Sequence, residues 1–308
     1  MTLRAEFTHP ELTATGERRA RVDLTGLRTL WFNTGTLCNL ACRNCYIESS
    51  PRNDQLVYLT QIEVRRYLAE ALQAHPELEE VGFTGGEPFM NPDILDMLQD
   101  GLETGLRILV LTNAMRPMQR LSSALDQLNR RHPGQLSIRV SLDHYTAAGH
   151  EDVRGPRSWE PALEGLDWLV KGGFDLAIAA RLMWGESAGG TRAGFAALFA
   201  SHGLPIDAAD PARLALFPEM ETDAEVPEIT DSCWGILGKS PDDVMCASSR
   251  MVVRHRGSDQ ASVIACTLLP YAEGFDLGPT LAGARGPVRL NHRHCARFCV
   301  LGGATCSG

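Results

Sequence analysis

The sequence has no long apolar run, no excess of positive charge and no low-complexity tract. Its apolar stretches fall well short of the roughly 18 residues that a membrane-spanning helix needs, and its first residues lack the apolar core of a signal peptide. The 29 Lys and Arg against 38 Asp and Glu leave a formal net charge of −9, so the protein as a whole repels polyanions. We therefore expect a cytoplasmic protein that works on neither a membrane nor a nucleic acid.

The composition is that of an ordinary globular protein. Hydrophobic residues make up 44% of the chain and charged residues 22%, and the 29 Gly and 17 Pro are far too few for a collagen-like sequence. The 308 residues exceed the usual size of one domain, which favours one large domain with a smaller appendage.

Short apolar runs alternate with longer helical patterns over most of the chain, which is typical of repeated β/α units around a parallel sheet. The expected strands are 28–33, 80–85, 107–113, 136–143, 174–183 and 213–220. The helices expected between them are 59–74, 92–104, 118–131, 159–172 and 191–202. The fold class is therefore α/β.

The pattern changes after residue 218. Residues 246–267 contain two β-rich runs joined by the turn 256–260, which predicts a hairpin. Residues 268–308 are rich in Gly and Pro and show no helical period. A segment this irregular needs something besides apolar burial to hold it, and its side chains include His292, His294, Cys295, Cys299 and Cys306.

Nine cysteines in a protein expected in a reducing compartment indicate metal binding or catalysis more than disulfides. Cys38, Cys42 and Cys45 directly follow the first expected strand, where β/α barrels carry their active sites. Zinc sites and complete cubane clusters usually have four protein ligands, so three thiolates leave one iron open for a substrate or cofactor. The alternative is a structural zinc site that borrows a fourth ligand.

The CxxxCxxC spacing of these cysteines resembles the signature of the radical S-adenosylmethionine (SAM) enzymes. The resemblance implies a partial (β/α)6 TIM-type barrel. It also implies a [4Fe-4S] cluster whose open iron chelates SAM and, once reduced, cleaves it to a 5′-deoxyadenosyl radical.

The segment Gly85, Gly86 and Glu87, after the second expected strand, resembles the family's GGE motif, which contacts the SAM amino group. Glycines let the backbone approach a ligand closely, and a carboxylate pairs with an ammonium group. Two alternatives stay open: the glycines form a tight turn, and Glu87 caps the turn before the helix expected at 92–104.

Further matches lie at the ends of later strands. Asn113 and Ser141 stand where the family commonly contacts the SAM ribose or carboxylate, and Arg181 could pair with the carboxylate. Turn hydrogen bonds for the first two residues, and a simple ion pair for Arg181, are the alternatives. The family often has an aromatic residue before the third cysteine, whereas this chain has Asn44 there and Tyr46 after it.

The C-terminal cysteines resemble the SPASM and Twitch extensions of radical SAM enzymes, which implies an auxiliary [4Fe-4S] cluster. Six cysteines are too few for two fully ligated clusters, so one is expected, held by Cys246 and Cys266 with two of the three cysteines that follow. Those three are Cys295, Cys299 and Cys306. Cys233 is expected to be a buried free thiol. A zinc site with His292 or His294 as a ligand is the alternative.

The sequence therefore predicts a lead-in over 1–27, a radical SAM core over 28–230 and an auxiliary-cluster domain over 231–308. The expected partners are a reductant such as flavodoxin or ferredoxin and an unidentified peptide or small-molecule substrate. The alternative is a non-catalytic protein that carries electrons or scaffolds a partner.

Overall fold

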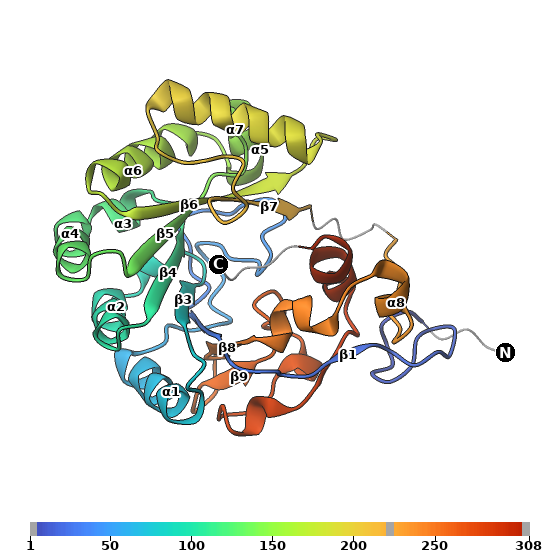
Figure 1. The fold of residues 1–308 in the computed structure, drawn as a ribbon. Coiled ribbons are helices and arrows are strands. Elements are labelled where there is room, and N and C mark those ends of the chain that lie inside the picture. The colour runs from blue at the N-terminus through green and yellow to red at the C-terminus, as the bar shows by residue number, and fades with distance from the viewer. Residues whose placement is uncertain (1–4, 220–224, 304–308) are drawn as a thin grey trace.

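The computed structural model describes residues 5–219 and 225–303, and a curved sheet of eight strands lies at its centre (Figure 1). Neighbouring strands follow the order β7-β6-β5-β4-β3-β2-β8-β9. Strands β2 to β7 are all parallel, so their carboxyl ends meet at one edge of the sheet. These are the six strands expected from the sequence: Thr29–Asn33 (β2), Glu80–Thr84 (β3), Arg107–Thr112 (β4), Leu136–Ser141 (β5), Asp175–Leu182 (β6) and Leu214–Pro218 (β7).

Helices flank the outer face of this sheet (Figure 1). Their bounds are Gln61–Ala74 (α1), Ile94–Glu103 (α2), Arg116–Gln119 (α3), Ser122–Arg131 (α4), Ala147–Arg154 (α5), Trp159–Lys171 (α6) and Ala188–His202 (α7). Thr60 caps α1 in a reciprocal capping box with Glu63, and the Ser187 side chain caps α7. The apolar faces of the helices and the sheet share one continuous core. The fold is therefore the expected α/β arrangement.

One predicted helix is divided in the structure, and one helix was not predicted. The helix expected over 118–131 is two helices, because Leu121 leaves helical geometry with φ −100° and ψ 9°. Helix α5 lies where no helix was expected. Its first residues are Ala147, Ala148 and Gly149, which give no apolar period. The Thr146 side chain caps its N-terminus.

The C-terminal hairpin extends the same sheet. Strand β8 (Ser249–Val253) pairs in parallel with β2, and β9 (Ser262–Ile264) pairs antiparallel with β8. The hairpin expected over 246–267 is therefore confirmed. Its position beside the first strand of the barrel follows from pairing between residues that are far apart in the sequence, such as Thr29 and Ser249, which no local pattern could indicate.

The rest of the C-terminal segment packs against the inner face of the sheet. Trp31 of β2 and Phe217 of β7 share a second core with Phe298 and with buried apolar residues from 244 onward. The segment expected to show no helical structure contains a π-helix at Cys295–Leu301. A π-helix repeats at a longer interval than an α-helix, so a search for the 3.6-residue period misses it.

The polar lead-in also belongs to the fold. Strand β1 (Arg21–Val22) pairs antiparallel with β10 (Val288–Arg289), and Ala20 and Val22 are fully buried. Arg19 forms a buried ion pair with Glu228 at 2.5 Å. The β1–β10 pairing therefore joins the lead-in to the C-terminal segment. The short helix α8 (Cys233–Leu237) follows Glu228 in the chain.

Replacement of Gly165 by Ala should destabilise the protein by about 1–3 kcal/mol. A Cβ atom at Gly165, on α6, would lie 1.9 Å from the Ala114 carbonyl oxygen, and a backbone atom cannot move aside cheaply. The control is Gly189→Ala on α7, whose Cβ would meet nothing within 4 Å. Urea unfolding of both variants measures the difference, and equal stabilities would contradict the close approach of α6 to Ala114.

Candidate active site

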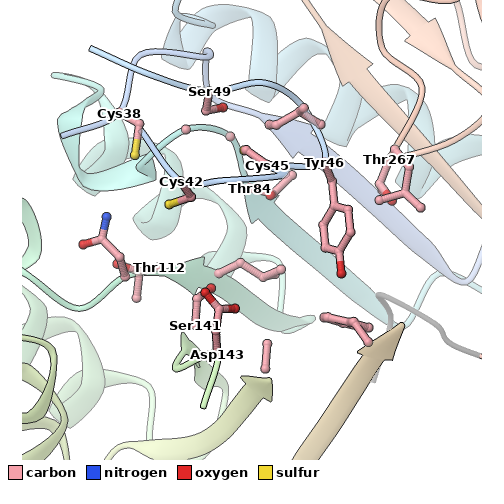
Figure 2. A pocket seen from close by; sticks show the side chains of 18 of the residues that line it. Cys38, Cys42, Cys45, Tyr46, Ser49, Thr84, Thr112, Ser141, Asp143 and Thr267 are labelled. Atoms are coloured by element: carbon pink, nitrogen blue, oxygen red, sulfur yellow. The ribbon is translucent and has the colours of Figure 1, made fainter. Parts of the chain in front are cut away.

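One cavity opens at the carboxyl ends of the parallel strands (Figure 2). Five of the strands, and the loops after them, contribute residues that the sequence singled out. Those that line the cavity are Cys38, Cys42, Cys45, Gly85, Gly86, Asn113, Ser141 and Arg181. Glu87 is the one member of the predicted SAM-binding set that does not line it. The structure therefore brings the predicted residues, apart from Glu87, to one cavity, and their roles stay predictions.

The loop that carries the three cysteines is held by strands on the far side of the barrel. Arg181 Nη1 donates hydrogen bonds to the main-chain carbonyls of Asn44, at 2.9 Å, and Arg43, at 3.3 Å. Its guanidinium also lies 4.7 Å from the centre of the Tyr46 ring. Tyr46 OH donates to the Pro218 carbonyl at the end of β7. Arg181 therefore holds the cysteine loop in addition to its ion pair with Asp143, whereas the sequence analysis gave a simple ion pair as the alternative.

The backbone conformation explains why a polar residue, Asn44, precedes the third cysteine. Asn44 adopts φ +55°, in the left-handed region that Asn tolerates better than an aromatic residue does. The aromatic side chain of this loop is displaced to Tyr46, which lines the cavity. Figure 2 shows its ring on the side away from Cys38.

The thiols are poorly placed to ionise without a cation. Burial raises the pKa of Cys38 to about 12, and burial also raises the pKa of Cys42, although Arg154 opposes that shift. A thiolate here therefore needs the positive charge of a metal. Within the described ranges, no three His, Cys, Asp or Glu side chains are spaced to hold a single metal ion. Three thiols that line one cavity are a donor set for an iron-sulfur cluster with one open iron.

Two arginines share one carboxylate at the mouth of the cavity. Arg154 Nε lies 2.6 Å from Asp143 Oδ2, and Arg181 Nε lies 3.4 Å from Asp143 Oδ1. Burial raises the pKa of Asp143, but the two guanidinium groups outweigh burial and hold it below its usual value. The trio carries a net positive charge beside the cysteines. The sequence analysis missed Arg154 because the residue ends the unexpected helix α5.

Gly85 and Gly86 are required by the approach of two backbones. A Cβ atom at Gly85 would lie 2.6 Å from the Gly35 carbonyl oxygen, and one at Gly86 would lie 2.2 Å from the Leu37 carbonyl oxygen. Main-chain hydrogen bonds join Gly86 to Gly35 and Glu87 to Leu37. The motif therefore clamps the end of β3 to the start of the cysteine loop, and it lines the cavity as well.

Glu87 turns its side chain into the protein. Its carboxylate accepts hydrogen bonds from Thr112 Oγ1 at 2.8 Å, the Asn113 amide at 2.9 Å and the Phe89 amide at 3.2 Å. The last of these caps a 3₁₀ turn at Pro88–Met90, as the structural alternative for this residue expected. Burial raises the pKa of Glu87 to about 7. The resemblance predicted a contact between this carboxylate and SAM, whereas these hydrogen bonds favour a structural role, and the Glu87→Gln variant described below separates the two.

A second, small cavity lies within the C-terminal segment. Four cysteines line it, together with His294: Cys246, Cys266, Cys295 and Cys299. Cys306 lies outside the described residues. Cys233 does not line this cavity; it is half-buried on α8 and accepts a hydrogen bond from the Thr230 amide. Leu268 lines both cavities.

Residues 32–186, half of the chain, match the family described as the Radical SAM superfamily. The chain belongs to the radical SAM superfamily. Its members use a [4Fe-4S] cluster and SAM, and the chain is accordingly an enzyme. In the described part of the chain, the structure contains no helix with both the length and the apolar character needed to cross a membrane.

Several curated radical SAM proteins are similar to parts of this chain. The AdoMet-dependent heme synthase of Methanosarcina barkeri is 28% identical over 145 residues, which are 46% of this chain and 38% of the synthase. The antilisterial bacteriocin subtilosin biosynthesis protein AlbA of Bacillus subtilis is 30% identical over 118 residues, 38% of this chain and 25% of AlbA. The matches thus cover less than half of each relative.

Solved radical SAM structures share the fold over a longer range. Streptococcus suis SuiB bound to S-adenosylmethionine aligns with a TM-score of 0.60 at 12% identity, over 82% of this chain and 63% of that one. Native anSMEcpe with bound AdoMet aligns with a TM-score of 0.58 at 14% identity, over 83% of this chain and 79% of the other. These alignments extend well past residue 186, so the likeness in fold includes C-terminal elements.

Glu87→Gln should lower the melting temperature and leave SAM affinity nearly unchanged. The glutamine amide presents one acceptor oxygen where three donors now meet a carboxylate, and an unpaired buried donor costs about 1–3 kcal/mol. Thermal unfolding and a SAM titration measure the two quantities. A 10- to 150-fold loss of SAM affinity at an unchanged melting temperature would instead support direct contact with the SAM amino group.

The same residue predicts a pH dependence of stability. In the folded protein the pKa of Glu87 is about 7, whereas the ordinary pKa of a glutamate side chain is 4.5. The stabilisation linked to this proton is complete below pH 4.5 and is lost as the pH rises through 7, by up to about 3 kcal/mol. Urea unfolding across this range should show that slope in the wild type and a flatter one in Glu87→Gln. Identical slopes would contradict the raised pKa.

Proposed function

We propose that this enzyme reductively cleaves SAM and uses the resulting radical on a substrate held in the same cavity. The observation that carries the proposal is the convergence of Cys38, Cys42 and Cys45 with Gly85 and Gly86 on one cavity. When bound, the [4Fe-4S] cluster supplies the electron that splits SAM into methionine and a 5′-deoxyadenosyl radical, and that radical takes a hydrogen atom from the substrate. The electron comes from a reductant such as flavodoxin or ferredoxin.

The protein's own residues bind and orient SAM. The Asn113 side chain donates to Asn39 Oδ1 and accepts from the Met115 amide, so its amide is fixed beside the cysteine loop. Ser141, with Asp143 and Arg154, presents polar groups from the end of β5 and from α5. We assign the SAM carboxylate to the positive trio of Arg154, Arg181 and Asp143, because two guanidinium groups share one carboxylate there.

We propose that the C-terminal cysteines hold one auxiliary [4Fe-4S] cluster. Cys246, Cys266, Cys295 and Cys299 line one small cavity, and four thiolates are a common ligand set for a [4Fe-4S] cluster. The zinc alternative keeps His294, which lines that cavity, as its candidate ligand. In this assignment residues 28–230 bind SAM and residues 231–308 bind the auxiliary cluster, with 1–27 as the lead-in.

Peptides and small molecules both stay within the proposed substrate range. AlbA is named for subtilosin biosynthesis, and a SuiB structure with a TM-score of 0.51 is described as bound to the precursor peptide SuiA. The heme synthase is named for a small-molecule product. The chain is similar to both groups, so the family alone does not choose between them.

Alanine at Cys38, Cys42 or Cys45 should each abolish reductive SAM cleavage. Each substitution removes one of three thiol ligands, and the described cysteines outside this loop line the other cavity or lie on α8. The measurement is 5′-deoxyadenosine release by the anaerobically reconstituted, dithionite-reduced protein. Cys233→Ala is the matched control and should release it at the wild-type rate. Wild-type release from any of the three loop variants would refute the assignment.

Iron content separates the two cluster sites. Two cubanes imply about eight irons per chain, so the triple variant of Cys38, Cys42 and Cys45 should retain about four. The double variant of Cys246 and Cys295 should likewise retain about four, because both thiols line the second cavity. Iron, sulfide and zinc analysis checks both. A triple variant that retained zinc and no iron would favour the zinc alternative for the C-terminal site.

A further inference from the structure

Arg250, on β8, is a buried arginine whose hydrogen-bond partners are neutral groups. The residue is 1% exposed. Its guanidinium donates hydrogen bonds to four main-chain carbonyls: Cys246 at 2.6 Å, Ser249 at 2.8 Å, Ala284 at 2.9 Å and Gly286 at 3.5 Å. In the part of the chain that the structure describes, no carboxylate lies within ion-pair distance of this guanidinium.

Two other buried arginines each have a carboxylate partner. Arg19 pairs with Glu228, and Arg181 pairs with Asp143. A buried charge is stable only when an opposite charge compensates for its lost hydration. Carbonyl groups satisfy the N–H donors of Arg250, but they carry no net charge. The described polypeptide therefore gives this guanidinium hydrogen-bond acceptors without a carboxylate counter-ion.

Arg250 lies beside the second cavity through its contact with Cys246. Cys246 is one of the four cysteines that line this cavity. A cysteine carbonyl oxygen can lie no more than about 5 Å from its own sulfur, so Arg250 Nη1 lies within about 8 Å of Cys246 Sγ. Among the ionisable groups of the described residues, the Cys246 thiol is the one whose charge interacts with Arg250.

Four thiolates around a cluster provide the missing sign of charge. A [4Fe-4S] cluster with four thiolates carries about two net negative charges when oxidised and about three after it accepts one electron. Cys246 is 6% exposed and Cys295 9%, so solvent screens charges at this site only weakly. A positive charge nearby therefore stabilises the bound cluster, and it stabilises the reduced state more than the oxidised state.

We propose that Arg250 is the counter-ion of the auxiliary cluster and raises its reduction potential. The inference rests on the proposed function, because it takes Cys246, Cys266, Cys295 and Cys299 as the ligands of that cluster. Reduction adds one electron from the external reductant and requires no proton. Arg250 is a positioning residue, since it holds the Cys246 main chain and acts through its charge.

The test is a redox titration of the full, anaerobically reconstituted protein, followed by electron paramagnetic resonance. The signal of the auxiliary cluster is the one that persists in the triple alanine variant of Cys38, Cys42 and Cys45. Arg250→Gln keeps an amide donor and removes the charge. At a fixed potential it should lower the ratio of reduced to oxidised auxiliary cluster about tenfold, because unit charges about 10 Å apart at a dielectric constant of about 20 interact with roughly this strength. For a one-electron couple, tenfold corresponds to a fall of about 59 mV.

Two control variants separate charge from structure. Arg250→Lys keeps the charge and loses the planar fork of donors, so its potential should stay near that of the wild type. Arg285→Gln removes an exposed positive charge next to Ala284, which solvent screens, and should leave the potential unchanged. Arg250→Met is the second neutral variant if Arg250→Gln fails to fold. A purely structural role predicts that Arg250→Lys and Arg250→Gln behave alike.

Iron analysis of the same samples distinguishes the possible failures. A folded neutral variant with wild-type iron content and wild-type potential would overturn the inference and leave the auxiliary cluster in place. Equal shifts in Arg250→Lys and Arg250→Gln would also overturn it. A neutral variant that folds but loses about four irons, while Arg250→Lys keeps them, would support the counter-ion role. A triple variant without iron would instead refute the auxiliary cluster itself.

Discussion

The contacts of the Arg181 guanidinium organise the active site. One side chain from β6 binds two carbonyls of the cysteine loop, lies over the Tyr46 ring and meets the carboxylate of Asp143. An arginine suits this position because its planar group offers several fixed donors and also stacks on an aromatic face. The loop has little regular structure of its own, so its shape follows from this anchor and from the clamp at Gly85 and Gly86.

The parts of the fold that depend on local pattern were predictable. Each of the six barrel strands is a short apolar run, and the burial that produces such a run also produces the strand. The meeting of the predicted site residues at one cavity followed, because parallel strands bring their carboxyl ends together. Helix α5 and its terminal Arg154 could not be found in this way, since a short helix without an apolar period gives no signal.

Motifs located residues better than they assigned contacts. Gly85 and Gly86 do lie at the cavity, yet their lack of a side chain is first explained by the carbonyls of Gly35 and Leu37. Glu87 belongs to the same motif and faces the protein interior. Cys246 and Cys266 were expected at one site with two of the three later cysteines. Cys295 and Cys299 line the same cavity as that pair, and Cys306 lies outside the described residues.

The parallel pairing of β2 with β8 has a consequence for how the protein is made. Thr29 lies beside Ser249, so the first strand of the barrel leaves the ribosome long before one of its two neighbours exists. Until then β2 has an open edge that could pair with another nascent chain. The loop that carries Cys38 follows this strand directly, so its three cysteines are also synthesised before the sheet is complete.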